Sequence, residues 1–262
     1  MSPSPPPGTV SRSALSCVHA DARQDEGYVR ALGGRRAQLL LSDPPYCILT
    51  RRRKGGDLRE GKGRKLDHEI VVRFESVRDY RQFTRDWLPR AHAHLAPGAP
   101  MVIWTNFLGK DPILEVAREL GYGHLAGEFS WAKRTTDRQG SERLLRLYEV
   151  ALVLLEKPLP PPRPADPALP WAAVSGYDDE GEGAEWGEHP HHKPMGALEP
   201  LLRAWSRPGD VVLDPFAGSG SIPVAAHRLG RTAACMELVG EWAARITERL
   251  RRADREAARP PA

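Results

Sequence analysis

The sequence predicts an α/β fold built around a mostly parallel sheet. Short apolar runs that suit buried strands alternate along the chain with stretches in which apolar residues recur at helical spacing, and this alternation is typical of strand–helix–strand units. Two of the apolar runs end at an aspartate followed by proline, Asp43 and Asp214, as strands do where they lead into a ligand-binding turn. The 262 residues suffice for one large domain or two small ones.

Seven apolar runs are predicted to form strands, and turn residues flank most of them. Residues 38–42 (Gln-Leu-Leu-Leu-Ser), for example, form a buried strand that stops before Pro44, because proline cannot donate a hydrogen bond to a β-ladder. The predicted strands are residues 15–19, 38–42, 101–105, 128–132, 149–155, 211–213 and 232–236.

Six helices are predicted between or after these strands. Apolar side chains from Tyr80 to Leu95 recur at helical spacing, with Pro89 expected to kink that helix. Glycines after two of the helices, Gly33 and Gly121, suit C-caps. The predicted helices are residues 24–32, 77–95, 112–120, 195–205, 221–229 and 241–253. Residues 133–147 are expected to join two strands, and residues 158–188 to form a solvent-facing loop.

Composition excludes several classes of protein. Apolar residues make up 40% and charged residues 27%, which is ordinary for a soluble globular chain. No apolar run approaches the roughly 18 residues that a membrane span needs, and the proline-rich start lacks the apolar region of a secretory signal. The three scattered cysteines argue against a disulfide framework or a zinc site, and the adjacent His191 and His192 lack further ligands at metal-binding spacing. The sequence therefore predicts a cytoplasmic protein without a metal.

The positive charge is concentrated in one glycine-broken segment. Residues 51–65 carry eight bases and two acids, a charge of 8 − 2 = +6, whereas the whole chain carries +4, so the remainder carries 4 − 6 = −2. This pattern is typical of a flexible segment that grips phosphates, with a solvated basic loop as the alternative. The candidate DNA-binding bases are Arg51, Arg52, Arg53, Lys54, Arg59, Lys62, Arg64 and Lys65.

The first chemical motif is residues 211–220, Val-Val-Leu-Asp-Pro-Phe-Ala-Gly-Ser-Gly. Gly218 and Gly220 let the backbone approach a ligand closely, and Glu237, at the end of the next predicted strand, can hold ribose hydroxyls. The segment has no Gly-Lys-Ser/Thr and is therefore not a Walker A loop. The alternative is a tight turn that needs glycines only for packing.

The second motif is Asp43-Pro44-Pro45-Tyr46, at the end of another predicted strand. Asp43 and the backbone carbonyl of the rigid Pro-Pro turn can accept hydrogen bonds from an exocyclic amine, and the Tyr46 ring can stack on a base. Cys47, which follows it, is expected to be a buried small hydrophobic residue and not a nucleophile.

Together these motifs resemble the DNA amino-methyltransferases, which methylate exocyclic base nitrogens with S-adenosylmethionine. In this family Asp-Pro-Pro-Tyr is paired with Phe-x-Gly-x-Gly, and the order here, with the catalytic motif first, resembles the circularly permuted β class. The segment His189-Pro190-His191-His192-Lys193-Pro194 resembles that class's His-Pro-x-x-Lys-Pro. The resemblance covers residues from about 14 to 250.

The resemblance implies a Rossmann-like methyltransferase fold with seven strands, the last hairpin strand antiparallel. It implies catalysis by Asp43, Pro44, Pro45 and Tyr46. It also implies an S-adenosylmethionine site made by Asp21, Lys193, Pro194, Asp214, Phe216, Gly218, Gly220 and Glu237. The expected layout is a disordered N-terminus (1–12), a catalytic half (13–157) with a basic loop (47–68), a proline-rich acidic insert (158–188), a cofactor-binding half (189–253) and a disordered tail (254–262).

The expected reaction is methyl transfer to a base flipped out of double-stranded DNA, since the amine cannot be reached inside a duplex. Resemblance favours adenine N6, because adenine enzymes usually carry Asp-Pro-Pro-Tyr and cytosine-N4 enzymes more often Ser-Pro-Pro-Tyr. Cytosine N4, an RNA base and a non-catalytic nucleic-acid-binding protein are the alternatives. The short acidic insert is a poor DNA-reading module. Base recognition is then expected to rest on the basic loop and residues 133–146, or on the second subunit of a homodimer.

Overall fold

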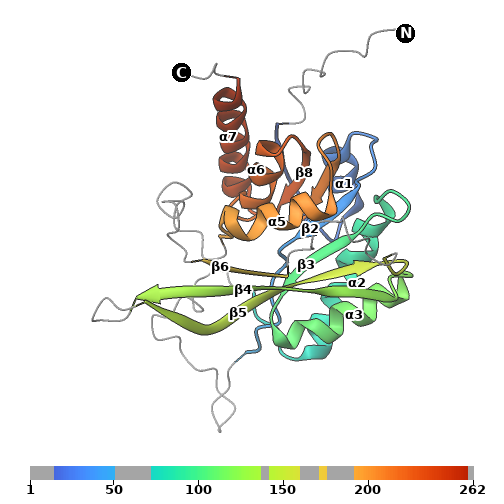
Figure 1. Ribbon diagram of the computed structural model, residues 1–262. Coiled ribbons are helices and arrows are strands. Elements are labelled where there is room, and N and C mark those ends of the chain that lie inside the picture. The colour runs from blue at the N-terminus through green and yellow to red at the C-terminus, as the bar shows by residue number, and fades with distance from the viewer. Residues whose placement is uncertain (1–14, 51–71, 137–141, 160–170, 176–191, 259–262) are drawn as a thin grey trace.

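The computed structural model describes residues 15–50, 72–136, 142–159, 171–175 and 192–258 (Figure 1). Their strands form one eight-stranded sheet in the order β1-β8-β7-β2-β3-β5-β4-β6. The strands are β1 (Cys17–His19), β2 (Leu39–Ser42), β3 (Met101–Thr105), β4 (His124–Thr136), β5 (Glu142–Leu155), β6 (Ala172–Ser175), β7 (Val211–Asp214) and β8 (Thr232–Glu237).

Strand direction follows the expected mixed pattern. Strands β1, β8, β7, β2 and β3 pair in parallel, and β6 pairs in parallel with β4. Strand β5 runs antiparallel to both of its neighbours, β3 and β4. The α/β class and the mostly parallel sheet are therefore confirmed, and β5 is the antiparallel strand.

All seven predicted strands are present, but the region after β3 contains more strand than the sequence suggested. Residues 133–147 were expected to be a connection, but their described parts, residues 133–136 and 142–147, extend the paired strands β4 and β5. An eighth strand, β6, lies within residues 158–188, which were expected to be a solvent-facing loop, and it pairs with β4 at the edge of the sheet. Both differences arise because β-pairing depends on a partner strand and leaves little signal in a polar local sequence.

Two layers of helices cover the sheet (Figure 1). Helices α1, α2 and α3 pack on one face, where Leu40, Met101 and Ile103 join their apolar side chains in one core cluster. Helices α5 and α6 pack on the other face with Leu39, Leu41 and Val102, and α7 closes a smaller cluster against β1. The helices are α1 (Asp25–Leu32), α2 (Val77–Ala93), α3 (Lys110–Glu119), α5 (Met195–Trp205), α6 (Ser221–Arg228) and α7 (Gly240–Ala257).

The helix predictions hold to within a few residues. Helix α1 ends at Gly33, which has a φ of 56°, as expected for a glycine C-cap. Helix α2 begins after Ser76, whose hydroxyl accepts a hydrogen bond from Asp79 N, and it continues through Pro89 without ending there. A short 3-10 helix, η3 (Phe107–Gly109), precedes α3. None of the helices in the described part of the chain is both long and apolar enough to cross a membrane.

The strand order brings both sequence motifs to one edge of the sheet. Strand β7, which leads into the glycine-containing turn, lies directly beside β2, which leads into Asp43. Because β5 is antiparallel, its residue Glu149 lies near the end of β3, beyond the Val150–Thr105 pair, at this same edge. The carboxyl edge of an open α/β sheet is where such folds bind ligands.

Candidate active site

A cavity of about 460 Å³ opens at the carboxyl edge of the sheet. It is lined by the segments that follow β1, β2, β7 and β8, with one face of α2 as a further wall. The predicted site residues in its lining are Asp21, Asp43, Pro44, Pro45, Tyr46, Phe216, Gly218 and Glu237. The fold thus brings together, in one cavity, residues that lie more than 190 positions apart in the sequence.

The turn after β7 is shaped by its glycines. Gly218 has a φ of 52° and Gly220 a φ of 84°, a left-handed conformation that glycine adopts readily. The Gly218 N–H donates to Glu237 Oε2 over 2.8 Å, so this glycine joins the cavity wall to β8. A Cβ on Gly220 would lie 3.0 Å from the Ile246 side chain, so helix packing as well as φ requires glycine there.

Glu237 connects two segments of the cavity wall. Besides the Gly218 N–H, its carboxylate accepts the Val239 N–H over 2.9 Å through Oε1. Burial raises the pKa of this carboxyl, while the backbone donors act in the opposite direction. Glu237 therefore holds the glycine-containing turn against the segment after β8.

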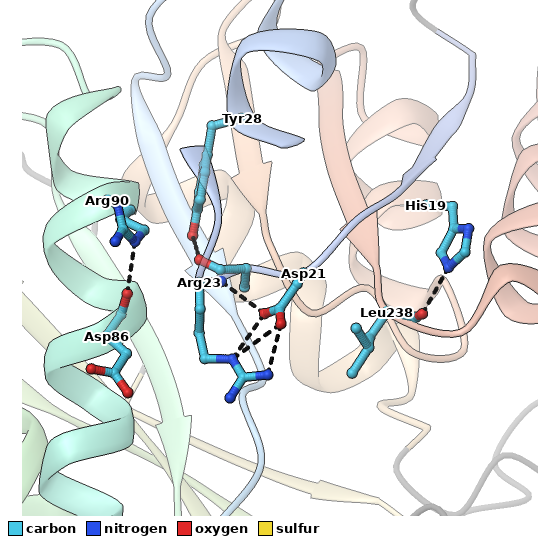
Figure 2. Close-up of polar contacts among 8 residues, drawn as sticks. His19, Asp21, Arg23, Tyr28, Asp86, Arg90 and Leu238 are labelled. Atoms are coloured by element: carbon cyan, nitrogen blue, oxygen red, sulfur yellow. Dashed lines mark hydrogen bonds and ion pairs between the residues drawn. The ribbon is translucent and has the colours of Figure 1, made fainter. Parts of the chain in front are cut away.

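Asp21 forms an ion pair with a cation on its own turn. Figure 2 shows its carboxylate against the Arg23 guanidinium, which donates to it through Nε and Nη2, the latter over 2.7 Å. Hydrogen bonding to Arg23 lowers the pKa of Asp21. The ring of His19, on β1, lies 3.0 Å from the Leu238 carbonyl oxygen, so the ends of β1 and β8 are also joined (Figure 2).

Helix α2 contributes a polar and aromatic wall. Gln82, Phe83 and Asp86 line the cavity from this helix, and the Gln82 amide donates to Asp86 over 2.9 Å. The Phe216 ring packs edge-on against Trp87 at a centroid distance of 5.0 Å, which ties the turn after β7 to α2.

Asp214 lies below the cavity and links the strands that carry the two motifs. Its Oδ1 accepts hydrogen bonds from the Ser42 hydroxyl over 3.0 Å and from the Phe216 N–H over 3.2 Å. Its Oδ2 is buried without a hydrogen-bond partner among the described residues. Burial raises the pKa of this carboxyl to about 8.

The Asp-Pro-Pro-Tyr turn lies over a buried ionic network. Lys193 Nζ contacts Asp43 Oδ2 and lies 3.0 Å from Glu149 Oε2, and only 2% of the Lys193 side chain is exposed. The Tyr46 hydroxyl donates to the same Glu149 oxygen over 2.6 Å. Burial lowers the pKa of Lys193, but the charges of Asp43 and Glu149 outweigh burial and raise it overall. Lys193 therefore stays protonated beneath the cavity.

Aromatic rings complete the surroundings of Lys193. Its ammonium lies 5.4 Å from the ring centroid of Tyr46, 5.3 Å from that of Trp104 and 5.9 Å from that of Trp131. These distances suit cation–π attraction, which helps to hold a charge away from water.

The geometry separates the predicted cofactor residues into two groups. Asp21, Phe216, Gly218 and Glu237 line the cavity, whereas Lys193, Pro194, Asp214 and Gly220 are not among the described residues that line it. Pro194 directly precedes α5. The other three contact residues of the lining: Lys193 contacts Asp43, Asp214 accepts from the Phe216 N–H, and the Gly220 N–H donates to the Ala217 carbonyl. Their direct assignment to the cofactor stays a prediction.

Glu149 was missed at the sequence level, although a signal was present. It is an acidic residue at the start of an apolar strand, and in an antiparallel strand that end lies at the ligand-binding edge. The orientation of the strand was needed to use this signal. The eight candidate DNA-binding bases and residues 189–191 lie outside the described residues. Cys47 is fully buried, as predicted.

A comparison with known protein families gives a clear result. The family model N6_N4_Mtase, a DNA methylase family, matches residues 37–248. The chain belongs to this DNA methylase family. The matched part of the methylase contains Asp43, Lys193, the glycine-containing turn and Glu237, while Asp21 lies just before it.

Relatives and solved structures agree with this membership. The methylase is 28% identical over 209 residues to YubD of Escherichia coli (strain K12), a match that covers 80% of this chain and 79% of YubD. Its fold is similar to the crystal structure of the M1.HpyAVI–SAM complex (TM-score 0.63, 20% identity, 90% of this chain and 98% of the other). It is also similar to PvuII DNA methyltransferase, which is cytosine-N4-specific (TM-score 0.59, 15% identity, 90% and 88%). At these identities the two structures establish the fold.

Proposed function

We propose that this DNA methylase uses S-adenosylmethionine to methylate adenine N6 in double-stranded DNA. The observation that carries the proposal is the meeting of Asp43, Tyr46, Gly218 and Glu237 in one cavity at the carboxyl edge of the sheet. Membership of the DNA methylase family supports methyl transfer to DNA.

The cavity suits S-adenosylmethionine in size and charge. Its volume lies within the 300–1,000 Å³ typical of small-molecule sites. Its lining contains five carboxylates (Asp21, Asp43, Asp79, Asp86 and Glu237) against one cationic side chain, Arg23. A ligand that carries a sulfonium and an ammonium group would find complementary charge there. The protein bound to this cofactor in the M1.HpyAVI complex has the same fold.

The cofactor and the target base would bind at different ends of the cavity. Glu237 would accept hydrogen bonds from the ribose, with Gly218 giving the ligand close access to the backbone. Bound there, the cofactor supplies an electrophilic methyl group on a sulfonium centre. Asp43 and the Pro44 carbonyl would accept hydrogen bonds from the base amine, so that its lone pair is directed outward for attack.

Asp43 has one oxygen free for this purpose. Its Oδ2 is engaged by Lys193, while its Oδ1 is buried without a hydrogen-bond partner among the described residues. A buried acceptor that lacks a donor costs about 1–3 kcal/mol. An amine N–H of the substrate would remove that cost, and Oδ1 could then receive the proton that the amine loses on methylation.

Tyr46 supports a flipped base as the substrate. Its ring is held in place by the hydrogen bond of its hydroxyl to Glu149, and Tyr46 lines the cavity next to Asp43. A fixed aromatic face stacks on a base with about 1–3 kcal/mol. The larger ring system of adenine gains more from this stacking than cytosine does. With DNA as substrate, the enzyme would act in the compartment that holds the DNA, predicted from the sequence to be the cytoplasm.

The experiment that tests the proposal uses the purified chain with S-adenosylmethionine and unmethylated plasmid DNA. After digestion to nucleosides, mass spectrometry should detect N6-methyladenine, and a reaction without cofactor serves as the control. N4-methylcytosine in place of N6-methyladenine would overturn the choice of base. Methylation of RNA but not of DNA would overturn the choice of polymer.

The basic segment 51–65 is proposed to contact DNA phosphates, on its charge of +6 alone. Replacing its eight bases with serine or glycine should weaken DNA binding and flatten its salt dependence. Each lost phosphate contact should remove about 0.9 from the slope of log K against log salt. Fluorescence anisotropy over a salt series measures this slope, and an unchanged slope would mean that the segment is only a solvated surface loop.

A further inference from the structure

We propose that Lys193 is a positioning residue for methyl transfer: by binding Oδ2 of Asp43 it reserves Oδ1 for the target amine. The inference deepens the proposed function and rests on it. It differs from the cofactor-binding role that the sequence predicted for Lys193, and it gives Glu149 a role that the sequence did not predict.

The two oxygens of the Asp43 carboxylate have different surroundings. A free carboxylate rotates, and either oxygen can then take a hydrogen bond from the substrate. Here Lys193 engages Oδ2, whereas Oδ1 has no partner among the described residues. Only one oxygen therefore lacks a donor, and its position is set by the contact on the other.

Lys193 is itself held in place by its neighbours. Glu149 Oε2 lies 3.0 Å from its Nζ, and Tyr46, Trp104 and Trp131 place aromatic rings around the ammonium. With 2% of its side chain exposed, Lys193 has little room for another rotamer. A flexible lysine could not hold the carboxylate in one orientation, whereas a lysine packed in this way can.

The same network joins the first and last residues of the Asp-Pro-Pro-Tyr turn. Glu149 accepts from the Tyr46 hydroxyl over 2.6 Å as well as pairing with Lys193. Asp43, which would bind the amine, and Tyr46, which would stack on the base, are thus oriented by the same ion cluster. Two carboxylates and one ammonium leave a charge of −2 + 1 = −1, the charge of Asp43 alone.

That charge balance provides the test. Lys193→Met leaves two largely buried carboxylates without a cation and should lower kcat about 100-fold, as a misplaced reacting group does. The Kd of S-adenosylmethionine and the KM for DNA should stay within about threefold. Lys193→Arg, which keeps the charge, should recover part of the lost kcat. Lys110→Met removes a lysine paired with Glu128 outside the cavity lining and serves as the matched control, with kcat unchanged.

The double variant Lys193→Met/Glu149→Gln separates positioning from charge compensation. It restores the net charge of −1, so the thermal stability lost in Lys193→Met should return, while kcat stays low because nothing holds Oδ2. Recovery of kcat to within fivefold of the wild type would overturn the inference, since Lys193 would then only neutralise Glu149. This variant also keeps the inference testable where Lys193→Met does not fold.

Three further outcomes are distinct. A loss of cofactor affinity in Lys193→Met that matches the loss of kcat would return Lys193 to the cofactor-binding role. An active wild type together with an active Lys193→Met overturns the inference alone. A wild type that methylates no nucleic acid overturns the proposed function, and the inference with it.

Discussion

The two ends of the cavity hold their carboxylates in different ways. At the proposed amine-binding end, Asp43 is paired with Lys193, a cation with 2% of its side chain exposed. At the opposite end, Asp21 is paired with Arg23, whose side chain is 48% exposed, and Glu237 is held by backbone N–H groups. Both ends line one cavity, so the difference does not follow from the overall shape of the site.

The two ends are expected to differ in how much the loss of one charged partner costs. Exposed ion pairs contribute about 0–1 kcal/mol because water screens them. Removing one partner of a buried pair costs several kcal/mol because the other charge is left without compensation. The amine-binding end is therefore expected to tolerate little change, and the Asp21 end much more.

The largest effect is expected for Asp43→Ala. The substitution removes the proposed acceptor for the base amine, so methyl transfer should fall by about 1,000-fold or more, somewhat above the usual effect of deleting one stabilising group. Cofactor affinity should change by less than about threefold, because Glu237 and the glycine-containing turn are intact. Single-turnover kinetics and calorimetry check both points. Methylation within tenfold of the wild type would contradict the role of Asp43.

A smaller effect, confined to cofactor binding, is expected for Glu237→Ala. The change removes the proposed ribose acceptor and the partner of the Gly218 N–H, so the Kd should rise about tenfold to 100-fold. Glu237→Gln keeps one acceptor oxygen and should weaken binding less.

Gly218→Val should weaken cofactor binding to a similar extent as Glu237→Ala. It places a β-branched side chain in the cavity lining at a φ of 52°, where such residues are strained. Calorimetry on both variants, with melting curves to confirm folding, tests this end of the cavity. Unchanged affinity in both would mean that the cofactor binds elsewhere.

Asp214, between the two ends, should make stability depend on pH. Its carboxyl is buried with neutral donors, and its pKa is about 8 against an ordinary value near 3.8. Between these values the folded state binds more protons than the unfolded state, so this group destabilises the fold increasingly as the pH rises from about 4 to about 8. The slope is at most about 1.4 kcal/mol per pH unit.

Asp214→Asn isolates this contribution. Asparagine retains an acceptor for Ser42 and Phe216 but does not titrate, so the stability of the variant relative to the wild type should rise between pH 5 and pH 8. Urea unfolding at several pH values measures the difference. A constant difference across that range would show that Asp214 does not titrate there.

The smallest effect is expected for Arg23→Ala, the counterpart of Lys193→Met at the exposed end. Loss of this screened pair should move the melting temperature by no more than about 2 °C and the cofactor Kd by less than about fivefold. Thermal melts and calorimetry provide the measurement. A loss of affinity above tenfold would erase the contrast between the two ends, because Arg23 would then act directly on the ligand.

The sequence alone determined the elements and the two motifs. Apolar runs such as residues 38–42 and 101–105, and helical spacing such as that from Tyr80 to Leu95, are local patterns that encode strands and helices directly. The Asp-Pro-Pro-Tyr turn and the glycines at 218 and 220 are contiguous strings whose backbone needs are also local. These were sufficient to predict the fold class and eight of the residues that line the cavity.

Only the tertiary structure decided which charged side chains pair with one another at the site. Lys193 lies 150 residues from Asp43 in the sequence, and Glu149 reaches them only because β2, β3 and β5 are neighbours and β5 runs antiparallel. The extension of β4 and β5 and the edge strand β6 likewise depend on pairing with another strand. A local pattern specifies what a segment can become, but strand order and direction arise from packing of the whole chain, and they determine which charges meet in the interior.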